Sequence, residues 1–230
     1  MEVLLLPSQD NTLYETSIDS GETINERSNG AGNFLFAGRT GLDAGFRLRR
    51  AVLKFDLGSL PPDAEILSAE LTLYQSKAAP DSPPAEMGLH RVLQEWGEGD
   101  SKGIGAEGQG DFPAAGDATW HHRLYPDTLW DAAGGSFDSI FSAVVTVGQD
   151  LGYYTWRCTS ALVADVNAWL QQPELNFGWI VVGGEFAGYS AHRFNSRENV
   201  TVEQRPRLKI VYRKPGSVFA DGFEAGQPCD

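Results

Sequence analysis

The sequence predicts an all-β protein, a β-sandwich with one short α-helix. The first observation is the stretch 49–74, where apolar residues recur at every second position in two runs. A period of two puts each apolar set on one face of a strand. Pro61 and Pro62 lie between the runs and lack the N–H that a strand ladder needs, so they mark a turn. The second observation is that residues 160–170 carry apolar side chains at helical spacing. We expect the two strands of 49–74 to form the centre of the core.

The other strands are predicted from short apolar runs bounded by Gly, Pro, Asn or Ser. In chain order they are residues 2–6 with a continuation over 10–14, then 33–38, 89–92, 143–147, 153–157, 177–182, 189–194 and 208–212. Of these, the run 177–182 is expected to be buried on both faces. The helix is expected to begin at a cap on Thr159 or Ser160 and to end before Pro173.

Three polar stretches, 16–33, 76–86 and 97–117, separate these strands and are expected to be loops. Residues 97–117 hold many Gly and acidic residues and almost no apolar ones. We therefore expect a surface excursion that adds nothing to the core. Loops of this length are usually functional or disordered.

Composition limits the partners of the chain. The 230 residues contain 18 Lys plus Arg and 31 Asp plus Glu, which gives a net charge of −13. An acidic surface repels phosphate backbones, which argues against binding to nucleic acid or to anionic membranes. No apolar run approaches the roughly 20 residues that span a bilayer. Direct binding of a polyanion is also disfavoured unless a cation bridges the two.

Several blocks resemble the DNRLRE-type domain of secreted bacterial and archaeal proteins. They are Phe55-Asp56, Leu60-Pro61-Pro62, the GDATW of 116–120, the NFGW of 176–179, the FNSREN of 194–199 and the RPRL of 205–208. The resemblance covers roughly residues 3–213, so we expect one domain over 1–213 and a C-terminal tail over 214–230. It implies a jelly-roll sandwich that is secreted and located outside the cell or on its surface. Some relatives of this family are alginate-binding carbohydrate modules.

Motifs for catalysis are missing from the sequence. There is no Gly-x-Ser-x-Gly elbow, HExxH helix or phosphate loop. Two of the four histidines, His121 and His122, are adjacent, and neighbours on a strand point to opposite faces. We expect ordinary polar histidines there and no enzymatic activity.

Calcium is the cofactor that the sequence suggests. Hard cations need six to eight oxygen ligands, and an acidic Gly-rich loop can supply carboxylates and carbonyls. Asp10 is a further candidate, because jelly-roll modules similar to this chain often hold calcium near the first strand. An acidic, solvated loop without a metal is the alternative. The candidate ligands are Glu95, Glu98, Asp100, Asp111, Asp117 and Asp10.

Two aromatic residues are the candidates for binding a polysaccharide by stacking. Tyr125 and Trp130 lie in the polar region between the predicted strands, and each would have to be exposed to act as a platform. Burial in a packing role is the alternative, since large aromatic residues are mostly buried. In the FNSREN block, Arg197 is expected to form a structural ion pair with a carboxylate such as Glu198. Arg49 and Asp56 are alternative partners for such a pair.

The two cysteines and the tail leave two alternatives open. Cys158 and Cys229 either form one disulfide, which suits an oxidising compartment, or remain independent thiols. Val218, Phe219 and Phe223 are the large apolar residues of the tail, and they can anchor it to an exposed sheet edge. Docking on the same subunit would let Cys229 reach Cys158, whereas docking on a neighbour would join subunits head to tail.

The expected function is therefore that of a non-catalytic extracellular structural or adhesive subunit. Such a subunit would self-assemble into an oligomer, fibre or surface matrix through sheet edges and terminal strands. The alternative is a carbohydrate-binding module that recognises an extracellular polysaccharide.

Overall fold

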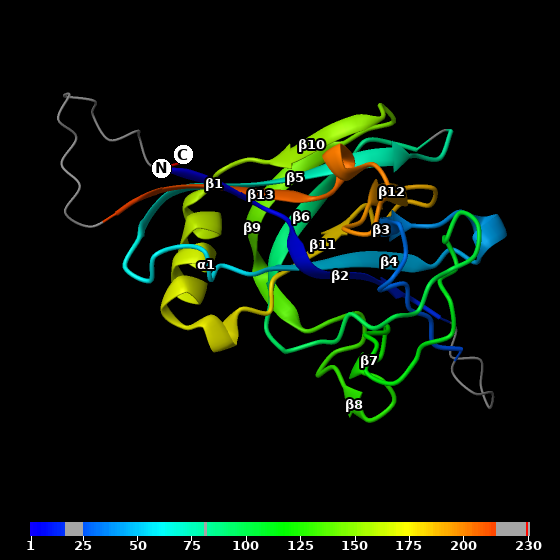
Figure 1. Cartoon of the computed structure of the whole chain (residues 1–230). Helices are drawn as coiled ribbons and strands as arrows, with labels where there is room; N and C mark the ends of the chain where they lie inside the picture. The colour runs from blue at the N-terminus through cyan, green and yellow to red at the C-terminus, as the bar shows by residue number, and fades with distance from the viewer. Residues whose placement is uncertain (17–24, 81, 215–228, 230) are drawn as a thin grey trace.

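The computed structural model describes residues 1–16, 25–80, 82–214 and 229 (Figure 1). Most of this part is β-structure, with one α-helix, α1 (Ser160–Gln171), and three short 3-10 helices, η1 (Leu42–Ala44), η2 (Pro173–Leu175) and η3 (Val202–Gln204). The strands are β1 (Glu2–Leu5), β2 (Pro7–Tyr14), β3 (Phe34–Arg39), β4 (Leu48–Phe55), β5 (Glu65–Lys77), β6 (Ala85–Val92), β7 (His122–Leu124), β8 (Thr128–Leu129), β9 (Phe137–Val147), β10 (Gly152–Trp156), β11 (Trp179–Gly183), β12 (His192–Asn195) and β13 (Arg207–Arg213). The predicted all-β sandwich with a single α-helix is confirmed.

The sandwich is one antiparallel sheet that curls into two layers. The first layer contains β1, β13, β5, β10 and β12, and the second contains β2, β4, β11, β6 and β9. Strand β3 pairs with β12 and with β4, so it joins the layers. The two strands predicted within 49–74 become β4 and β5, which lie in different layers. They are central, as expected, because their apolar faces meet across the core.

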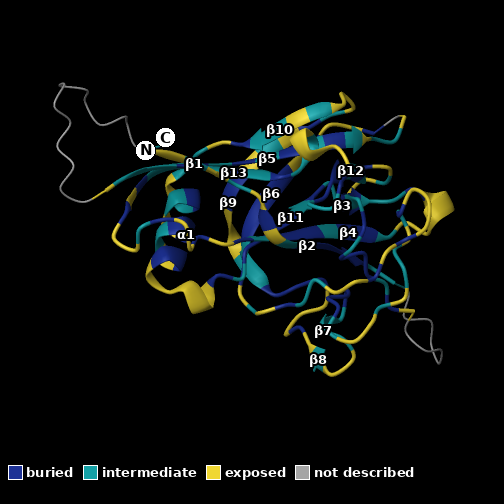
Figure 2. Ribbon diagram, in the orientation of Figure 1, coloured by how far each residue is buried: buried dark blue, intermediate teal, exposed yellow. Residues whose placement is uncertain are grey.

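The main core lies between the two layers. It contains the inward side chains of β4 and β5, including Leu53, Phe55 and Leu71, together with Trp156 and Trp179 from β10 and β11. Figure 2 shows the buried residues gathered along the central strands, whereas η1 and the segment after α1 are exposed. The alternation of apolar residues in 49–74 therefore correctly predicts which side chains face the core between the two layers.

A second apolar cluster covers the outer face of the second layer. Val52 of β4 and Ile180 of β11 point away from the main core, and they pack with Trp96, Trp120 and Trp130. These tryptophans come from the long segment between β6 and β9, which folds back over the sheet. This explains why 177–182 is buried on both faces, as the sequence predicts. The three tryptophans flank residues 97–117, and no residue of 97–117 belongs to either apolar cluster, so this stretch adds nothing to the core, as expected.

Helix α1 closes one end of the sandwich and packs against β5 and β9. The Thr159 hydroxyl caps it by accepting a hydrogen bond from the Leu162 N–H at 3.0 Å. Its buried side places the Trp169 ring edge-on against Trp179, with 4.4 Å between the ring centroids. No helix in the described part of the chain is long and apolar enough to cross a membrane.

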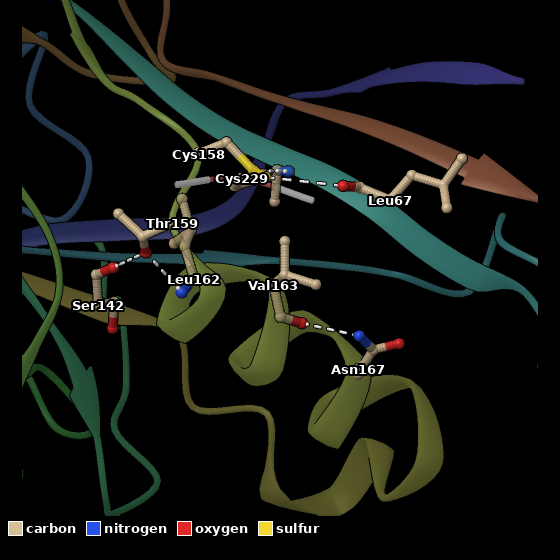
Figure 3. Close-up of a disulfide and its surroundings, with 9 residues drawn as sticks. Leu67, Ser142, Cys158, Thr159, Leu162, Val163, Asn167 and Cys229 are labelled. Carbon is tan, nitrogen blue, oxygen red and sulfur yellow. Dashed lines mark hydrogen bonds between the residues drawn. A yellow bond between two sulfur atoms is a disulfide. The ribbon is translucent and has the colours of Figure 1, made fainter. Parts of the chain in front are cut away.

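A disulfide ties the end of the chain to the start of α1. Cys158 precedes the capping Thr159, and it is bonded to Cys229 with a Cα–Cα distance of 5.3 Å (Figure 3). Of the two alternatives for the cysteines, the structure therefore contains the disulfide. The proposed anchors Val218, Phe219 and Phe223 lie outside the described residues.

Candidate metal centre

Three carboxylates from distant parts of the chain meet beside β2. They belong to Asp10, Glu98 and Glu198, and one oxygen from each lies within 4.8 Å of the other two. Asp10 is on β2, Glu98 is at the start of the Gly-rich excursion, and Glu198 is in the turn that follows β12. The sheet topology brings the three segments to one place, and Arg197 lies among the carboxylates.

Asp10 is the most deeply buried member of this cluster. Its side chain is inaccessible to solvent, and its Oδ2 accepts a hydrogen bond from the backbone N–H of Arg197 at 2.8 Å. Its own backbone N–H donates to Glu98 Oε1, also at 2.8 Å. The other carboxylate oxygen, Oδ1, is buried and has no hydrogen-bond partner. A buried polar atom of this kind is costly unless something binds it.

Arg197 neutralises part of the cluster. Its guanidinium donates to both oxygens of Glu98, from Nε to Oε1 at 2.6 Å and from Nη2 to Oε2 at 3.0 Å. Its Nε also lies 2.8 Å from Glu198 Oε1, which confirms the ion pair that the sequence predicts between these neighbours. The second oxygen of Glu198, Oε2, is buried without a partner, as is Asp10 Oδ1.

The electrostatics of the cluster favour a bound proton or cation. Burial raises the pKa of Asp10 well above its usual range, and the nearby Glu198 carboxylate raises it further. Burial also raises the pKa of Glu198. Hydrogen bonding to Glu98 raises the pKa of Arg197, so the guanidinium stays charged. Three carboxylates face one guanidinium, and a divalent cation would balance the excess negative charge.

The donor set fits a hard cation such as calcium, although this remains a proposal. Asp10 Oδ1 and Glu198 Oε2 are the two free carboxylate oxygens, and oxygen is the ligand that calcium prefers. The remaining positions of a calcium shell would belong to water or carbonyl oxygens. Glu98 would act mainly through its charge, since both of its oxygens already accept hydrogen bonds.

The other predicted calcium ligands do not join this cluster. Glu95 and Asp100 are exposed, and Asp111 is half-buried with its Oδ1 accepting from the N–H of Phe112. Asp117 is fully buried but organises a separate turn, where its Oδ2 accepts from the Ala114 N–H at 2.8 Å and from the Ser101 hydroxyl. Only Asp10 and Glu98 of the six candidates therefore come together, and Glu198 completes the group.

Residues 97–117, the excursion, are held in a defined conformation by acidic side chains that accept hydrogen bonds from backbone and amide N–H groups. Glu107 is almost fully buried, and its carboxylate accepts hydrogen bonds from Asn29, Asn33 and the N–H of Phe34. The sequence interpretation did not single out this residue. Nothing distinguishes it locally, because its partners lie more than 70 positions away.

The candidate aromatic platforms are buried or half-buried. Trp130 is only 5% exposed, and its indole N–H donates to the Thr119 carbonyl at 3.0 Å, so it has the packing role that was the alternative to an exposed platform. The ring belongs to the second apolar cluster. Tyr125 is half-buried and packs edge-on against His122.

The histidines also differ in one respect from the expectation. His121 and His122 both turn Nδ1 toward the buried Glu26, at 2.6 and 3.6 Å from its Oε1. His121 precedes β7, so the alternation of a strand does not separate the two rings. His192 lies 3.3 Å from the Ser82 hydroxyl, and both residues are buried.

Comparisons with known proteins leave the family open. No protein-family model matches the chain, and no curated protein matches it. The resemblance to DNRLRE-type domains therefore stays a prediction.

Proposed function

We propose that the chain is a non-catalytic structural or adhesive subunit that works outside the cell and assembles through the terminal strands of its sheet. The observation that carries this proposal is the exposed apolar surface on the two strands at the ends of the sheet order, β1 and β9. Leu4 on β1 is 53% exposed, and Ile140 on β9 is 71% exposed.

Both strands also have a free edge for pairing. Within the described residues, β1 pairs only with β13, and β9 pairs only with β6. A terminal strand presents unpaired N–H and C=O groups, and exposed apolar side chains beside them favour association. Parts of β9 are less available, because the Thr159 hydroxyl binds the Ser142 carbonyl and the Ile140 N–H donates to Asp138 Oδ1 at 3.0 Å. We assign the half with the exposed side chains of Ile140 and Phe141 to assembly, where pairing would displace the Asp138 carboxylate from the Ile140 N–H.

Pairing of β1 from one copy with β9 of the next would join different surfaces of the two subunits. Such a contact is head to tail, and it produces a filament when the rotation between copies does not close a ring. Backbone hydrogen bonds would supply affinity, and the alternating side chains would set the register.

The extracellular setting is supported by the disulfide and by the carboxylate cluster. Disulfides persist mainly in oxidising compartments. Calcium sites of modest affinity suit extracellular modules, where the ion is abundant. The Cys158–Cys229 bond and a cation beside Asp10 would together stabilise the ends of the domain.

Sedimentation velocity of charged variants tests the proposal. We expect the wild-type protein to form oligomers in a concentration-dependent manner, and Ile140→Lys or Leu4→Lys to shift it to monomers. The matched controls are Ile104→Lys and Leu42→Lys, which add the same charge at exposed apolar residues outside β1 and β9. Equal sedimentation of all four variants, or a wild-type protein that stays monomeric at every concentration, would contradict the proposal.

The carbohydrate-binding alternative receives less support. Its candidate platforms are a buried Trp130 and a half-buried Tyr125. It stays a prediction.

A further inference from the structure

A pocket of about 430 Å³ opens at the other end of the sandwich from α1. It is lined by residues of β3 and of the η1 loop, by the end of β5, by the excursion near Gly108 and by the segment that leads into β12. The volume lies in the range of pockets that take small molecules. We call it the Tyr189 pocket, after the aromatic residue in its wall.

The lining of the Tyr189 pocket contains several basic side chains, although the protein as a whole is strongly acidic. Arg49, Lys77 and Arg193 line it, and Asp43 is the one acidic residue among the described residues of its lining. None of these four forms an ion pair with another residue in the described part of the chain. The chain as a whole carries a net charge of −13, so this local excess of positive charge runs against its composition.

Arg49 is held in place without a carboxylate. It is only 7% exposed, its Nη1 donates to the Leu48 carbonyl at 2.8 Å, and its guanidinium lies over the Tyr14 ring at 4.8 Å. Its Nε is buried and has no hydrogen-bond partner. Burial lowers the pKa of Arg49 to about 10, which still leaves the group charged at neutral pH. A buried guanidinium without an anion is costly, and an anionic ligand would relieve this cost.

The nearby carboxylates are occupied elsewhere. Glu15 raises the pKa of Arg49, but its Oε2 accepts from the Leu48 N–H at 2.7 Å. Burial lowers the pKa of Arg193 and the charge of Glu107 offsets only part of this, while the Glu107 oxygens already bind Asn29, Asn33 and Phe34. Arg193 itself lies over the Phe34 ring at 3.8 Å and donates from Nε to Ser76, which leaves its terminal nitrogens for a ligand.

Another part of the lining is apolar and includes an aromatic ring. Tyr189 is 45% exposed and has a positive φ of 62°, which is uncommon for a residue other than glycine. A Cβ on Gly41 would overlap Cε1 of Tyr189, so the ring packs directly on the glycine backbone. Phe36 and several alanines complete the apolar lining. A planar or pyranose ring can stack on such a surface.

We infer that the Tyr189 pocket binds a small carboxylate borne on a ring, with the carboxylate beside Arg193 and Lys77 and the ring against Tyr189. Bidentate pairing with a guanidinium explains the preference for a carboxylate. The ring is either a sugar or an aromatic ring, since both offer a flat apolar face. This site is separate from β1, β9 and the carboxylate cluster, so it does not depend on the proposed assembly.

Ligand-observed NMR titrations with two matched pairs of probes test the inference. Benzoate and benzamide differ in charge but hardly in shape, and glucuronate and glucose differ in the same way. We expect saturable binding of at least one carboxylate and about tenfold weaker binding of its neutral partner, since a charge-assisted contact is lost. Comparison of benzoate with glucuronate identifies the kind of ring.

Variants place the binding in this pocket. Lys77→Gln and Arg193→Gln should each weaken the preferred carboxylate about tenfold, whereas Lys102→Gln on the exposed excursion should not. Tyr189→Ala should weaken it as well, with Tyr153→Ala on β10 as the control. Thermal melting of each variant identifies a loss of fold. The inference is overturned if neither carboxylate binds at tens of millimolar, if neutral probes bind equally well, or if folded pocket variants bind like the controls.

Discussion

At the residue scale, the buried carboxylate of Asp10 needs a bound proton or cation to offset the cost of burying its charge. One oxygen is bound by a backbone N–H, and the other is buried without a partner. Burial raises its folded-state pKa above the value in the unfolded chain. The folded protein therefore binds more protons between these two values, and the free energy of unfolding falls as the pH rises through them.

The variant Asp10→Asn distinguishes two effects on stability: the cost of burying a charged carboxylate and the gain from binding a cation. In a chelator at neutral pH, we expect the variant to melt at a higher temperature than the wild type, because a buried charge has been removed. Calcium at about 100 times its Kd should stabilise the wild type by about 2.7 kcal/mol. It should leave Asp10→Asn unchanged. Asp100→Asn, on the exposed part of the excursion, is the control and should keep the calcium response. Calorimetry that finds the same wild-type melting with calcium and chelator would remove the cation from this site.

His192 gives a pH dependence of opposite sign. The imidazole is buried against Ser82, and desolvation lowers its pKa from 6.5 to about 4. Between these values the unfolded chain binds a proton that the folded protein excludes, so the free energy of unfolding should fall as the pH drops from 6.5 to 4. The substitution His192→Gln removes the imidazole that binds this proton in the unfolded chain. We expect denaturant titrations of the variant to show a weaker loss between pH 6.5 and 4 than the wild type, and an identical slope would contradict this reading of His192.

At the element scale, the segment between β6 and β9 behaves as a packed layer. Its flanks contribute Trp96, Trp120 and Trp130 to the second apolar cluster. Its polar centre is fixed by two buried carboxylates: Glu107 accepts hydrogen bonds from Asn29 and Asn33, and Asp117 Oδ2 accepts from the Ala114 N–H within the segment. Hydrogen bonds of this kind let a polar stretch pack against a sheet.

Two glycines of this segment provide a matched test. Gly99 and Gly105 both have a positive φ, of 75° and 63°, but a Cβ on Gly99 would overlap the buried Asp117 carboxylate, whereas Gly105 faces open space. Gly105→Ala should cost about 1 kcal/mol for the backbone alone. Gly99→Ala should cost several times more, about 3 kcal/mol or above, because Asp117 must move. Equal urea midpoints for the two variants would show that the excursion is not packed as described.

The sequence predicts the individual strands and the helix better than it predicts the tertiary contacts between them. The period of two locates β4 and β5, and helical spacing with a Thr159 cap locates α1, because both signals are local. The packing of the segment between β6 and β9 over the second layer has only one signal in the sequence, the apolar residues Val52 and Ile180 on the outer face of that layer. The sequence leaves open whether Trp130 is exposed or buried, because a polar neighbourhood does not show which distant sheet an aromatic residue packs on.

The carboxylate cluster shows the same limit. Asp10 and Glu98 enter as calcium candidates for unrelated reasons, and Glu198 enters only as a partner of Arg197. Their convergence depends on contacts between positions 88 to 187 residues apart, which no local pattern encodes.

At the scale of the whole molecule, the disulfide links the C-terminus to the sandwich. The Cys158–Cys229 bond spans 71 positions, and closing a loop of this length removes about 4 kcal/mol of conformational entropy from the unfolded chain. We expect Cys158→Ser with Cys229→Ser to lower the free energy of unfolding by about 2 to 4 kcal/mol. Reduction of the wild type should have the same effect and should leave the double variant unchanged. A reduced wild type that unfolds at the same denaturant concentration as the oxidised protein would show that the bond adds no stability.

Assembly is the property that most directly distinguishes a structural subunit from an isolated binding module. The measurement is negative-stain electron microscopy of the purified, oxidised protein in calcium over a concentration series, beside Ile140→Lys and its control Ile104→Lys. Head-to-tail addition of β1 to β9 predicts filaments one subunit wide for the wild type and for Ile104→Lys, and single particles for Ile140→Lys. Single particles at every concentration for all three proteins would contradict the proposal that this chain is a self-assembling subunit.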